Sequence, residues 1–587
     1  MKIPKRHLEK FVREVADQCF ISQNARATRG ATYANYYQFG ADEPNNAAIY
    51  NKIFSYLDDL ESLLYSPVTL RYRISNPDLP NVVEEAKGRA AAARLRALVR
   101  ASETDTTIST AVLWALIKGK TLLKQTWKRG QFQSDVIMPE DFGVLRENHE
   151  RLDEDMEAFG HSMLITPYQF DRMICNNPER DLLRKRARRL AGESKMRKGG
   201  TMTVTTGGLY PFQAAGAGVP TSRGLVDWMS QPMPQLAPQV EGQLLQLEEI
   251  WIWDDDRGDW STFQIIGDDI LVMGKNYIMN ALAWDSVSLT ENNALKGRHP
   301  YTDFCPNRTA DYFWGRSEIL NIALLQESIN SRLNGINRIL RKQEDPPKKF
   351  IGSSGVNQQA LARFNKPGGY WVDTNPNAKV ELEANAVPAD LWASLHEYER
   401  MFDEMGGLPP QARGVASGVR GQGHADTIIR MFSARFKDRA LLIERDVAAA
   451  GALMLDLARV HDDKKLTAWV EAQQAGLEAA EQNPLIVPPA PGLAAVNFRM
   501  GNLDEDMRLD IDSHSSSPAF SQDSKNLIFD LFKIKAASPA DVIEHTDTPD
   551  PEGMLAGLIR REVAAAAAEE KELKIKAEAA AQHGRSH

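Results

Sequence analysis

The 587-residue sequence predicts a mainly helical α+β fold made of several regions. Three observations predict this class. Apolar residues recur at spacings of three and four through three stretches between residues 317 and 460, which indicates long amphipathic helices. Before residue 316, short alternating strands are interspersed with helices. The chain is also long enough to bury a large core and to form several domains.

Residues 1–316 are predicted to form one α+β region. Alternation of apolar and polar residues indicates strands, and an apolar stripe or a composition rich in Ala, Arg and Glu indicates helices. The predicted helices are 5–20, 44–65, 82–103 and 106–118, and the predicted strands are 68–74, 120–127, 132–137 and 163–165.

Residues 178–192 are predicted to form a strongly basic helix. Such a run can bind nucleic acid, but it is more often a solvated face that pairs with nearby acids, and we favour the second interpretation. Residues 196–245 are rich in Gly, Pro, Ser, Thr and Ala. They are predicted to form a long, flexible excursion, and their glycines do not fit a phosphate-binding motif.

Two tryptophan-containing strands, 250–253 and 260–266, are joined by the acidic turn 254–259. An acidic turn can hold calcium. This turn lacks the ligand count and the terminal Glu of an EF-hand loop, so we interpret it as the solvated turn of a hairpin.

The first long helix is predicted over residues 317–344, and Pro346 and Pro347 stop it. Beside its apolar face runs a second, polar stripe that is almost free of carboxylates. The apolar face consists of Ile322, Leu325, Ile329, Leu333, Ile336 and Leu340, and the polar stripe of Asn330, Asn334, Asn337 and Arg341.

An insert, residues 345–388, follows with short predicted strands at 349–351, 370–373 and 379–383. It has little room for a core of its own, so we expect it to pair with neighbouring copies or with a partner. The second long helix is predicted over 389–406, with Leu391, Leu395, Tyr398, Phe402 and Met405 on one face.

A strong stop signal ends this second helix and predicts a hinge. It consists of Gly406, Gly407, Pro409 and Pro410. The loop 407–424 that follows is rich in glycine and contains Arg413, Arg420 and His424. The third helix is predicted over 425–460. Residues 461–587 are patchy, with helices at 520–534 and 539–543 and a final Ala-, Glu- and Lys-rich helix that begins after Asp550.

The composition excludes several functional classes. The formal net charge of −9 argues against a protein that coats nucleic acid. The three cysteines are far apart and odd in number, which fits a reducing compartment. No apolar run reaches the ~20 residues that cross a bilayer, so we expect no membrane association. Motifs for nucleotide binding, nucleophilic catalysis and zinc are missing. We therefore expect a non-enzyme without metal or cofactor.

The order helix, small β insert, helix, glycine-rich loop and long helix resembles the portal proteins, or head–tail connectors, of tailed double-stranded DNA bacteriophages. The resemblance covers about 150 residues. The segments that carry it are Tyr312-Phe-Trp-Gly-Arg-Ser317, the Gln326/Asn330/Asn334/Asn337 series, Asp345-Pro-Pro347, Lys366-Pro-Gly-Gly369, Gly407-Leu-Pro-Pro410, the Gly/Arg loop and His424-Ala425.

The resemblance implies a portal-protein fold with wing, stem, clip and crown regions. Residues 1–316 would be the wing, 317–344 and 389–406 the two stem helices, and 345–388 the clip. Residues 407–424 would be the tunnel loop, and 425–460 the long helix that returns to the wing. The crown and a C-terminal helical tail would occupy 461–587.

The resemblance also implies a function. The chain would form a homo-oligomeric ring, about twelve copies, at one capsid vertex of the virion, after assembly in the host cytoplasm. Double-stranded DNA would pass through the ring during DNA packaging and ejection. Its other partners would be the terminase large subunit, the major capsid and scaffolding proteins, and head–tail adaptor or tail proteins.

In such a ring the polar stripe Asn330, Asn334, Asn337 and Arg341 would face the channel, and Arg413, Arg420 and His424 would meet DNA. Arg430, Arg435 and Arg439 on the long helix would either meet phosphate or pair with acids of the adjacent subunit. Two alternatives remain open. The chain could be another structural head or adaptor component, or, with less support, a packaging enzyme that acts on nucleic acid.

Overall fold

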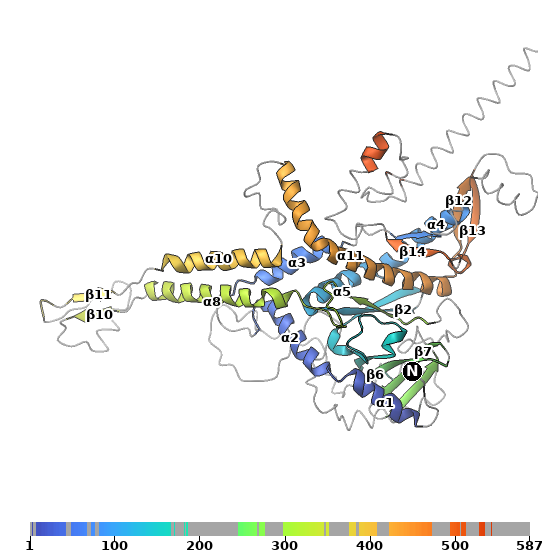
Figure 1. Cartoon of the computed structure of the whole chain (residues 1–587), viewed down its shortest axis with the longest axis horizontal. Helices are drawn as coiled ribbons and strands as arrows, with labels where there is room; N and C mark the ends of the chain where they lie inside the picture. Colours follow the sequence, from blue (N-terminus) through green and yellow to red (C-terminus); the bar gives the residue numbers. More distant parts are fainter. Residues whose placement is uncertain are drawn as a thin grey trace, which may run out of the picture. The chain divides into compact units, whose positions relative to one another are not determined.

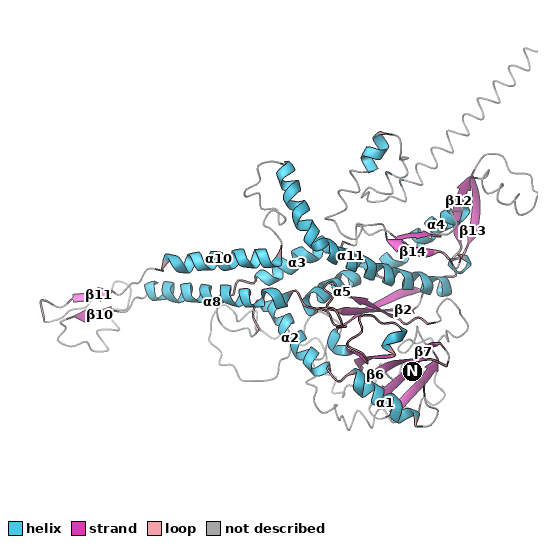
Figure 2. Cartoon of the chain, in the orientation of Figure 1, coloured by secondary structure: helices cyan, strands magenta, loops and turns pink. Residues whose placement is uncertain are grey.

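We describe the protein from a computed structural model (Figures 1 and 2). The structure describes residues 7–42, 49–66, 72–76, 82–165, 245–266, 269–275, 297–344, 348–351, 375–382, 387–407, 422–471 and 493–511, with single-residue gaps at 129, 257, 378 and 505 and a few short pieces elsewhere. Its helices and antiparallel sheets confirm the α+β class. The chain divides into two compact units. Unit 1 comprises 1–31, 59–318 and 433–587, and unit 2 comprises 32–58 and 319–432.

The N-terminal helices agree with the sequence prediction with one exception. Helix α2 is unpredicted, because its sequence mixes Gly, Ala, Asn and Arg without an apolar stripe. Elsewhere an apolar stripe or a composition rich in Ala, Arg and Glu was sufficient to place a helix. The helices are α1 (Leu8–Cys19), α2 (Gln23–Phe39), α3 (Lys52–Leu64), α4 (Val82–Ala101) and α5 (Thr104–Lys118).

A three-stranded antiparallel sheet in unit 1 has the order β3-β2-β9. Its strands are β2 (Thr121–Lys128), β3 (Gln131–Ile137) and β9 (Tyr301–Phe304). Lys128 pairs with Gln131 across the turn, which confirms the predicted hairpin. Helix α5 packs against this sheet, and its buried side includes Ile108, Val112 and Leu116.

A five-stranded antiparallel sheet has the order β4-β5-β6-β7-β8, so each strand pairs with its neighbour in sequence. The acidic segment 254–259 is the turn between β6 and β7, where the Gly258 N–H donates to the Asp254 carbonyl over 2.8 Å. This agrees with the hairpin interpretation. The strands are β4 (Phe142–Val144), β5 (Ala158–Ile165), β6 (Leu245–Asp254), β7 (Asp259–Ile266) and β8 (Asp269–Lys275).

An aromatic cluster fills the core between the two sheets of unit 1. Phe159 stacks on Trp251 and meets Trp260 and Tyr301 edge-on or tilted, with ring centroids 4.9 to 6.1 Å apart. Such rings bury large apolar areas and fix the geometry of a core. The two sheets are therefore joined by interlocking aromatic side chains.

The segment after α11 (Gln422–His461) contains three strands that the sequence analysis does not predict. They are β12 (Leu466–Glu471), β13 (Leu493–Phe498) and β14 (Arg508–Ile511). β12 pairs with β13, whereas β14 pairs with β1 (Tyr72–Ser75) near the start of the chain. Residues 508–511 therefore belong to the same unit as the N-terminal strand.

Unit 2 contains the pair of long helices that the sequence predicts. Helix α8 (Ile319–Glu344) and helix α10 (Ala389–Gly406) lie side by side and antiparallel, with β10 (Lys348–Ile351) and β11 (Lys379–Leu382) at one end of the pair (Figure 1). β10 pairs with β11, so two of the three predicted strands of the insert are confirmed. The third, 370–373, lies outside the described residues.

Three further predictions fall wholly or mostly outside the described residues. They are the basic helix 178–192, the excursion 196–245 and the C-terminal helix after Asp550.

Candidate functional site

The inner side of the α8–α10 pair is apolar. Ile322, Ile329 and Ile336 of α8 are buried, as are Leu395 and Phe402 of α10. The Arg332 guanidinium lies 5.8 Å from the centre of the Tyr398 ring, so the two helices are in contact at these turns. The isoleucines recur every seven residues, as expected of the apolar stripe by which one helix packs against another.

Asn330 departs from the expectation of an exposed channel residue. Its side chain is buried, its Nδ2 donates to the Gly40 carbonyl over 2.8 Å, and its Oδ1 accepts from Gln326 Nε2 and from the Tyr50 N–H. A buried amide has to satisfy its hydrogen bonds, and here Gly40, Tyr50 and Gln326 of the same chain provide the partners. We correct the prediction accordingly: Asn330 binds the backbone of Gly40 and of Tyr50 to α8.

The other members of the predicted polar stripe differ in exposure. Asn334 and Asn337 are half-buried, and Arg341 is exposed. Arg341 therefore keeps the accessibility that the channel prediction requires, and no ion pair of Arg341 occurs among the residues that the structure describes.

The end of α10 is anchored by α3. Lys52 Nζ lies 3.0 Å from Asp403 Oδ1 and 5.1 Å from the centre of the Phe402 ring, and the Tyr56 hydroxyl donates to the Gly406 carbonyl over 2.8 Å. Gly407 has a φ of 77°, the left-handed conformation that favours glycine at a helix end. A Cβ on Gly406 would lie 2.8 Å from the Tyr56 ring. Close packing against Tyr56 explains the glycine at 406, and the left-handed conformation explains the glycine at 407. Their role as a hinge stays a prediction.

The outer sides of the two helices carry exposed residues at helical spacing. We call Leu320, Leu324, Glu327, Ser331, Arg338 and Arg341 the α8 outer face, and Asp390, Arg400, Met401, Glu404 and Met405 the α10 outer face. Sequence reasoning missed the two leucines. The signal was available, because Leu320 and Leu324 lie one turn apart and out of phase with the buried isoleucines.

The predicted tunnel loop falls largely outside the described residues. This applies to Arg413, Arg420, Pro409 and Pro410, so their predicted roles are not tested by the structure. His424 lies within the described backbone of α11, near its first turn.

Arg439 and Arg445 of α11 are paired within the chain. Arg439 lies 2.6 Å from Glu318 Oε1, and the same Glu318 oxygen accepts from Asn307 Nδ2 over 2.7 Å. Arg445 lies 3.4 Å from Asp446 Oδ1. For Arg439 the structure therefore favours pairing with an acid over contact with phosphate, and the acid belongs to the same chain.

Asp446 is the most deeply buried acid of this part of α11. Burial and the neighbouring Asp303 raise its pKa well above the ordinary value. Its Oδ2 accepts the Cys305 N–H over 3.0 Å, and Arg308 lies 3.3 Å from its Oδ1. Burial also raises the pKa of the Cys305 thiol to about 12, so this cysteine is an inert core residue.

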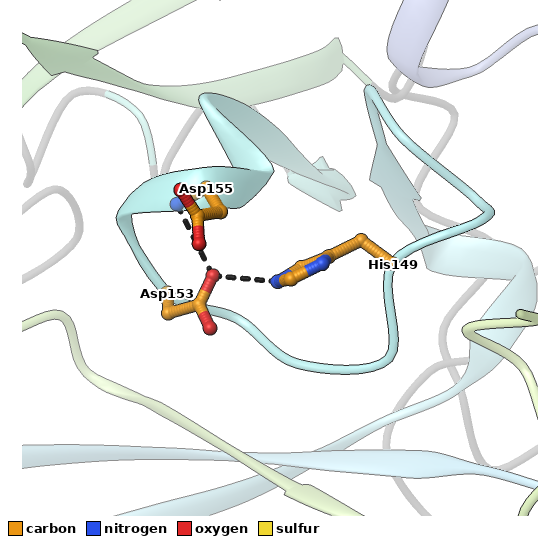
Figure 3. Close-up of side chains that lie close together, drawn as sticks. All are labelled: His149, Asp153 and Asp155. Atoms are coloured by element: carbon orange, nitrogen blue, oxygen red, sulfur yellow. Dashed lines mark hydrogen bonds and ion pairs between the residues drawn. The ribbon is translucent and has the colours of Figure 1, made fainter.

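One group of side chains could hold a cation, although the sequence analysis predicts no metal. His149, Asp153 and Asp155 lie together between β4 and β5, and one ligand atom from each falls within 4.8 Å of the others (Figure 3). Asp153 Oδ1 is 2.7 Å from His149 Nε2 and accepts the Asp155 N–H over 3.2 Å. These internal hydrogen bonds account for the arrangement without an ion, so we assign no function to it.

Comparison with known proteins gives matches among solved structures alone. No family model matches the chain, and no curated protein matches it. Among solved structures, a chain from the neck of a native GTA particle computed with C12 symmetry matches with a TM-score of 0.32 and 9% identity, covering 83% of this chain and 87% of that chain. None of the helices in the described part of the chain is long and apolar enough to span a membrane.

Proposed function

We propose that this chain is a portal protein: a ring-forming subunit at one capsid vertex through which double-stranded DNA enters and leaves a phage head. The observation that carries the proposal is the helix pair of unit 2. Two long antiparallel helices end in a two-stranded β10–β11 ribbon, and both helices keep apolar side chains exposed on their outer faces.

The ribbon supports assembly on physical grounds. A two-stranded ribbon is marginally stable in isolation and needs additional strands or packing to be stable. Exposed leucine and methionine side chains at helical spacing likewise favour burial against another surface. A ring of identical copies would supply both, because each copy meets the next through the same contact.

DNA passage is the second part of the proposal. A moving duplex needs weak, sequence-independent contacts, which basic side chains make with phosphates. Arg413 and Arg420 are the strongest candidates, because their loop contains no acid before Asp426. The terminase large subunit, the capsid and scaffolding proteins, and the adaptor or tail proteins would be the docking partners. The proposed function assigns no catalytic role to this chain.

Electron microscopy of the purified full-length protein tests assembly. We expect negative-stain class averages of closed rings, about twelve-fold by the family resemblance. A protein that stays monomeric at micromolar concentration in both low and high salt would overturn the proposal. Hydrolysis of ATP or cleavage of DNA that a point mutation in this chain abolishes would favour the packaging-enzyme alternative instead.

A double substitution tests DNA handling. Arg413→Ala with Arg420→Ala should leave rings intact and lower the amount of packaged or retained DNA per capsid. The matched control is Lys464→Ala with Lys465→Ala, which also removes two positive charges, from exposed positions outside the loop. Full genomes in the arginine variant would show that the charge of the loop has no role in DNA handling.

A further inference from the structure

Two buried side-chain amides of α8, one helical turn apart, bind the backbone of a distant part of unit 2. We call Gln326 and Asn330 the amide pair. Gln326 Oε1 accepts the Lys52 N–H over 3.1 Å. Its Nε2 donates to the Tyr50 carbonyl over 2.7 Å and to Asn330 Oδ1 over 3.0 Å. Asn330 also accepts the Tyr50 N–H and donates to the Gly40 carbonyl. The two amides therefore form one connected network.

The network uses all four polar atoms of the amide pair. Its backbone partners are the Gly40 carbonyl, both the N–H and the carbonyl of Tyr50, and the Lys52 N–H. A buried polar group that loses its hydrogen bond costs free energy. A turn of α8 by about 40° about its own axis would move these amides by about 4 Å, which no hydrogen bond can follow. The network is therefore satisfied in one rotation of α8.

Apolar packing defines the rotation of α8 less narrowly. The buried isoleucines are flanked on both sides by half-buried apolar side chains. The set comprises Ile322, Ile329 and Ile336 in the middle, with Leu325, Leu333 and Ile339 beside them. At about 100° per residue, these six side chains cover an arc of about 120°. Contact between apolar surfaces is non-directional, so α8 could turn by tens of degrees and keep most of its apolar contacts.

Two other directional contacts of α8 involve longer side chains. Glu327, which is exposed, accepts a hydrogen bond from the Tyr36 hydroxyl. Arg332, which is half-buried, lies 5.8 Å from the centre of the Tyr398 ring. A long side chain can change its rotamer to follow a turning helix, and a cation–π contact at a partly exposed site is weak. These contacts therefore restrict the rotation less than the short, buried amides do.

We infer that the amide pair fixes the rotation of α8 about its own axis, so Gln326 and Asn330 are positioning residues. This rotation decides which side chains of α8 face outward, among them Arg338 and Arg341. The purpose of a single rotation rests on the proposed function, because every copy in a symmetric ring has to present the same surface. Buried polar side chains select one arrangement among several apolar ones in other helical assemblies as well.

A distance between two spin labels within one chain tests the inference. The labels are attached to Arg338→Cys on α8 and Ala393→Cys on α10, both at exposed positions. The chain also carries Cys175→Ser, and the buried Cys19 and Cys305 remain in place. Labelled protein is diluted with unlabelled protein, so that each distance measured by pulsed electron paramagnetic resonance comes from a single chain. The unaltered amide pair should give one narrow distance distribution.

Replacing both amides by leucine should broaden this distribution. A label about 8 Å from the helix axis moves by about 5 Å when the helix turns by about 40°, so Gln326→Leu with Asn330→Leu should widen the distribution by about that distance. Gln326→Met alone keeps the length of the side chain and removes its three hydrogen bonds, and it should widen the distribution in the same sense. If circular dichroism shows that the double variant is unfolded, the single variant decides the test.

The matched control adds the same two leucines elsewhere on α8. Ser328→Leu with Ser331→Leu should leave the distribution unchanged, since the Ser328 hydroxyl donates to the Leu324 carbonyl within the helix and Ser331 is exposed. Equal widening in this control would overturn the inference, because any change of the α8 surface would then have the same effect.

An unchanged distribution in the folded amide variants would show that apolar packing alone fixes the rotation. A lower unfolding midpoint without widening would give the amide pair a purely stabilising role and would also overturn the inference. The distance is measured within one chain, so the result does not depend on ring formation. Absence of rings in the unaltered protein would overturn the portal function and leave the rotation of α8 to be decided by the distances.

Discussion

A fully buried ion pair between the two main sheets of unit 1 gives the sharpest stability prediction. Lys124 of β2 places its Nζ 2.8 Å from Oε2 of Glu249 on β6. The other carboxylate oxygen of Glu249 accepts from Trp251 Nε1 over 2.7 Å and from the Tyr301 hydroxyl over 2.8 Å. Glu249 is completely buried and Lys124 is 5% exposed. Both carboxylate oxygens of Glu249 are thus hydrogen-bonded.

Glu249→Gln removes the negative charge but keeps the shape of the side chain. It leaves the Lys124 ammonium buried without a counter-charge, a change that typically costs about 3 to 5 kcal/mol. Lys124→Met leaves the carboxylate with its two neutral donors, so its cost should lie toward the lower end of that range. The double variant Lys124→Met with Glu249→Gln removes both charges and should be more stable than Glu249→Gln alone, by about 1 to 3 kcal/mol.

Urea unfolding followed by tryptophan fluorescence measures these differences, because Trp251 and Trp260 lie in the same core as the ion pair. The relevant quantity is the midpoint of the transition that reports on these tryptophans, compared at equal slope. A Glu249→Gln variant with an unchanged midpoint would refute the reasoning. A double variant less stable than both single variants would also contradict it, since no buried charge would then remain unpaired.

Three further substitutions have defined outcomes. Burial raises the pKa of Asp105 from 3.8 to about 6, so the folded state favours the neutral carboxyl and loses stability as pH rises from about 4 to 6. Asp105→Asn should therefore raise the free energy of unfolding by up to about 3 kcal/mol above pH 6 and leave it unchanged below pH 4, as measured by urea unfolding at both pH values. Gly315 has a φ of 63°, and a Cβ there would lie 2.5 Å from Cys305 Sγ; Gly315→Ala should cost about 2 to 5 kcal/mol, seen as a lower thermal midpoint, and an unchanged midpoint would contradict the strain argument. Asn330→Ala should cost about 2 to 4 kcal/mol and speed amide exchange at Tyr50, whereas unchanged exchange would show that the amide does not hold this segment.

Local periodicity was sufficient to predict the long helices and the two hairpins. The buried isoleucines of α8 recur at seven-residue intervals, and the stop signal at Gly407 coincides with a left-handed residue. In these segments the backbone hydrogen-bond partner of each residue lies within the same helix or across one turn. The local pattern of residues is therefore enough to predict the element.

Strand pairs between distant parts of the chain could not be predicted in this way. β14 has four residues, and its partner β1 lies more than four hundred residues earlier. A four-residue strand has too little alternation to stand out, and nothing in its own sequence indicates the partner. β12 and β13 have six residues each, so their alternation is also too short to predict a strand.

The polar stripe on α8 shows the limit for the candidate site. Asparagine spacing predicts which residues share a side of a helix, but not what faces that side. The Gly40 carbonyl and the Tyr50 N–H come from a distant segment, and only the folded chain brings them to Asn330. The same sequence pattern therefore fits a polar residue that contacts water, one that contacts DNA and one that hydrogen-bonds to the backbone of its own chain.

The distribution of paired and unpaired cations connects these observations to function. In unit 1, Arg26, Lys120, Lys124 and Arg439 lie close to Glu147, Asp303, Glu249 and Glu318, respectively, so these positive charges are compensated within the chain. On unit 2, Arg338 and Arg341 are exposed, and within the described residues they have no ion-pair partner. A charge that its own chain leaves uncompensated is the one available to a neighbour or to a phosphate. Experiments on assembly and on DNA passage should therefore begin with the helix pair rather than with the more numerous basic residues of unit 1.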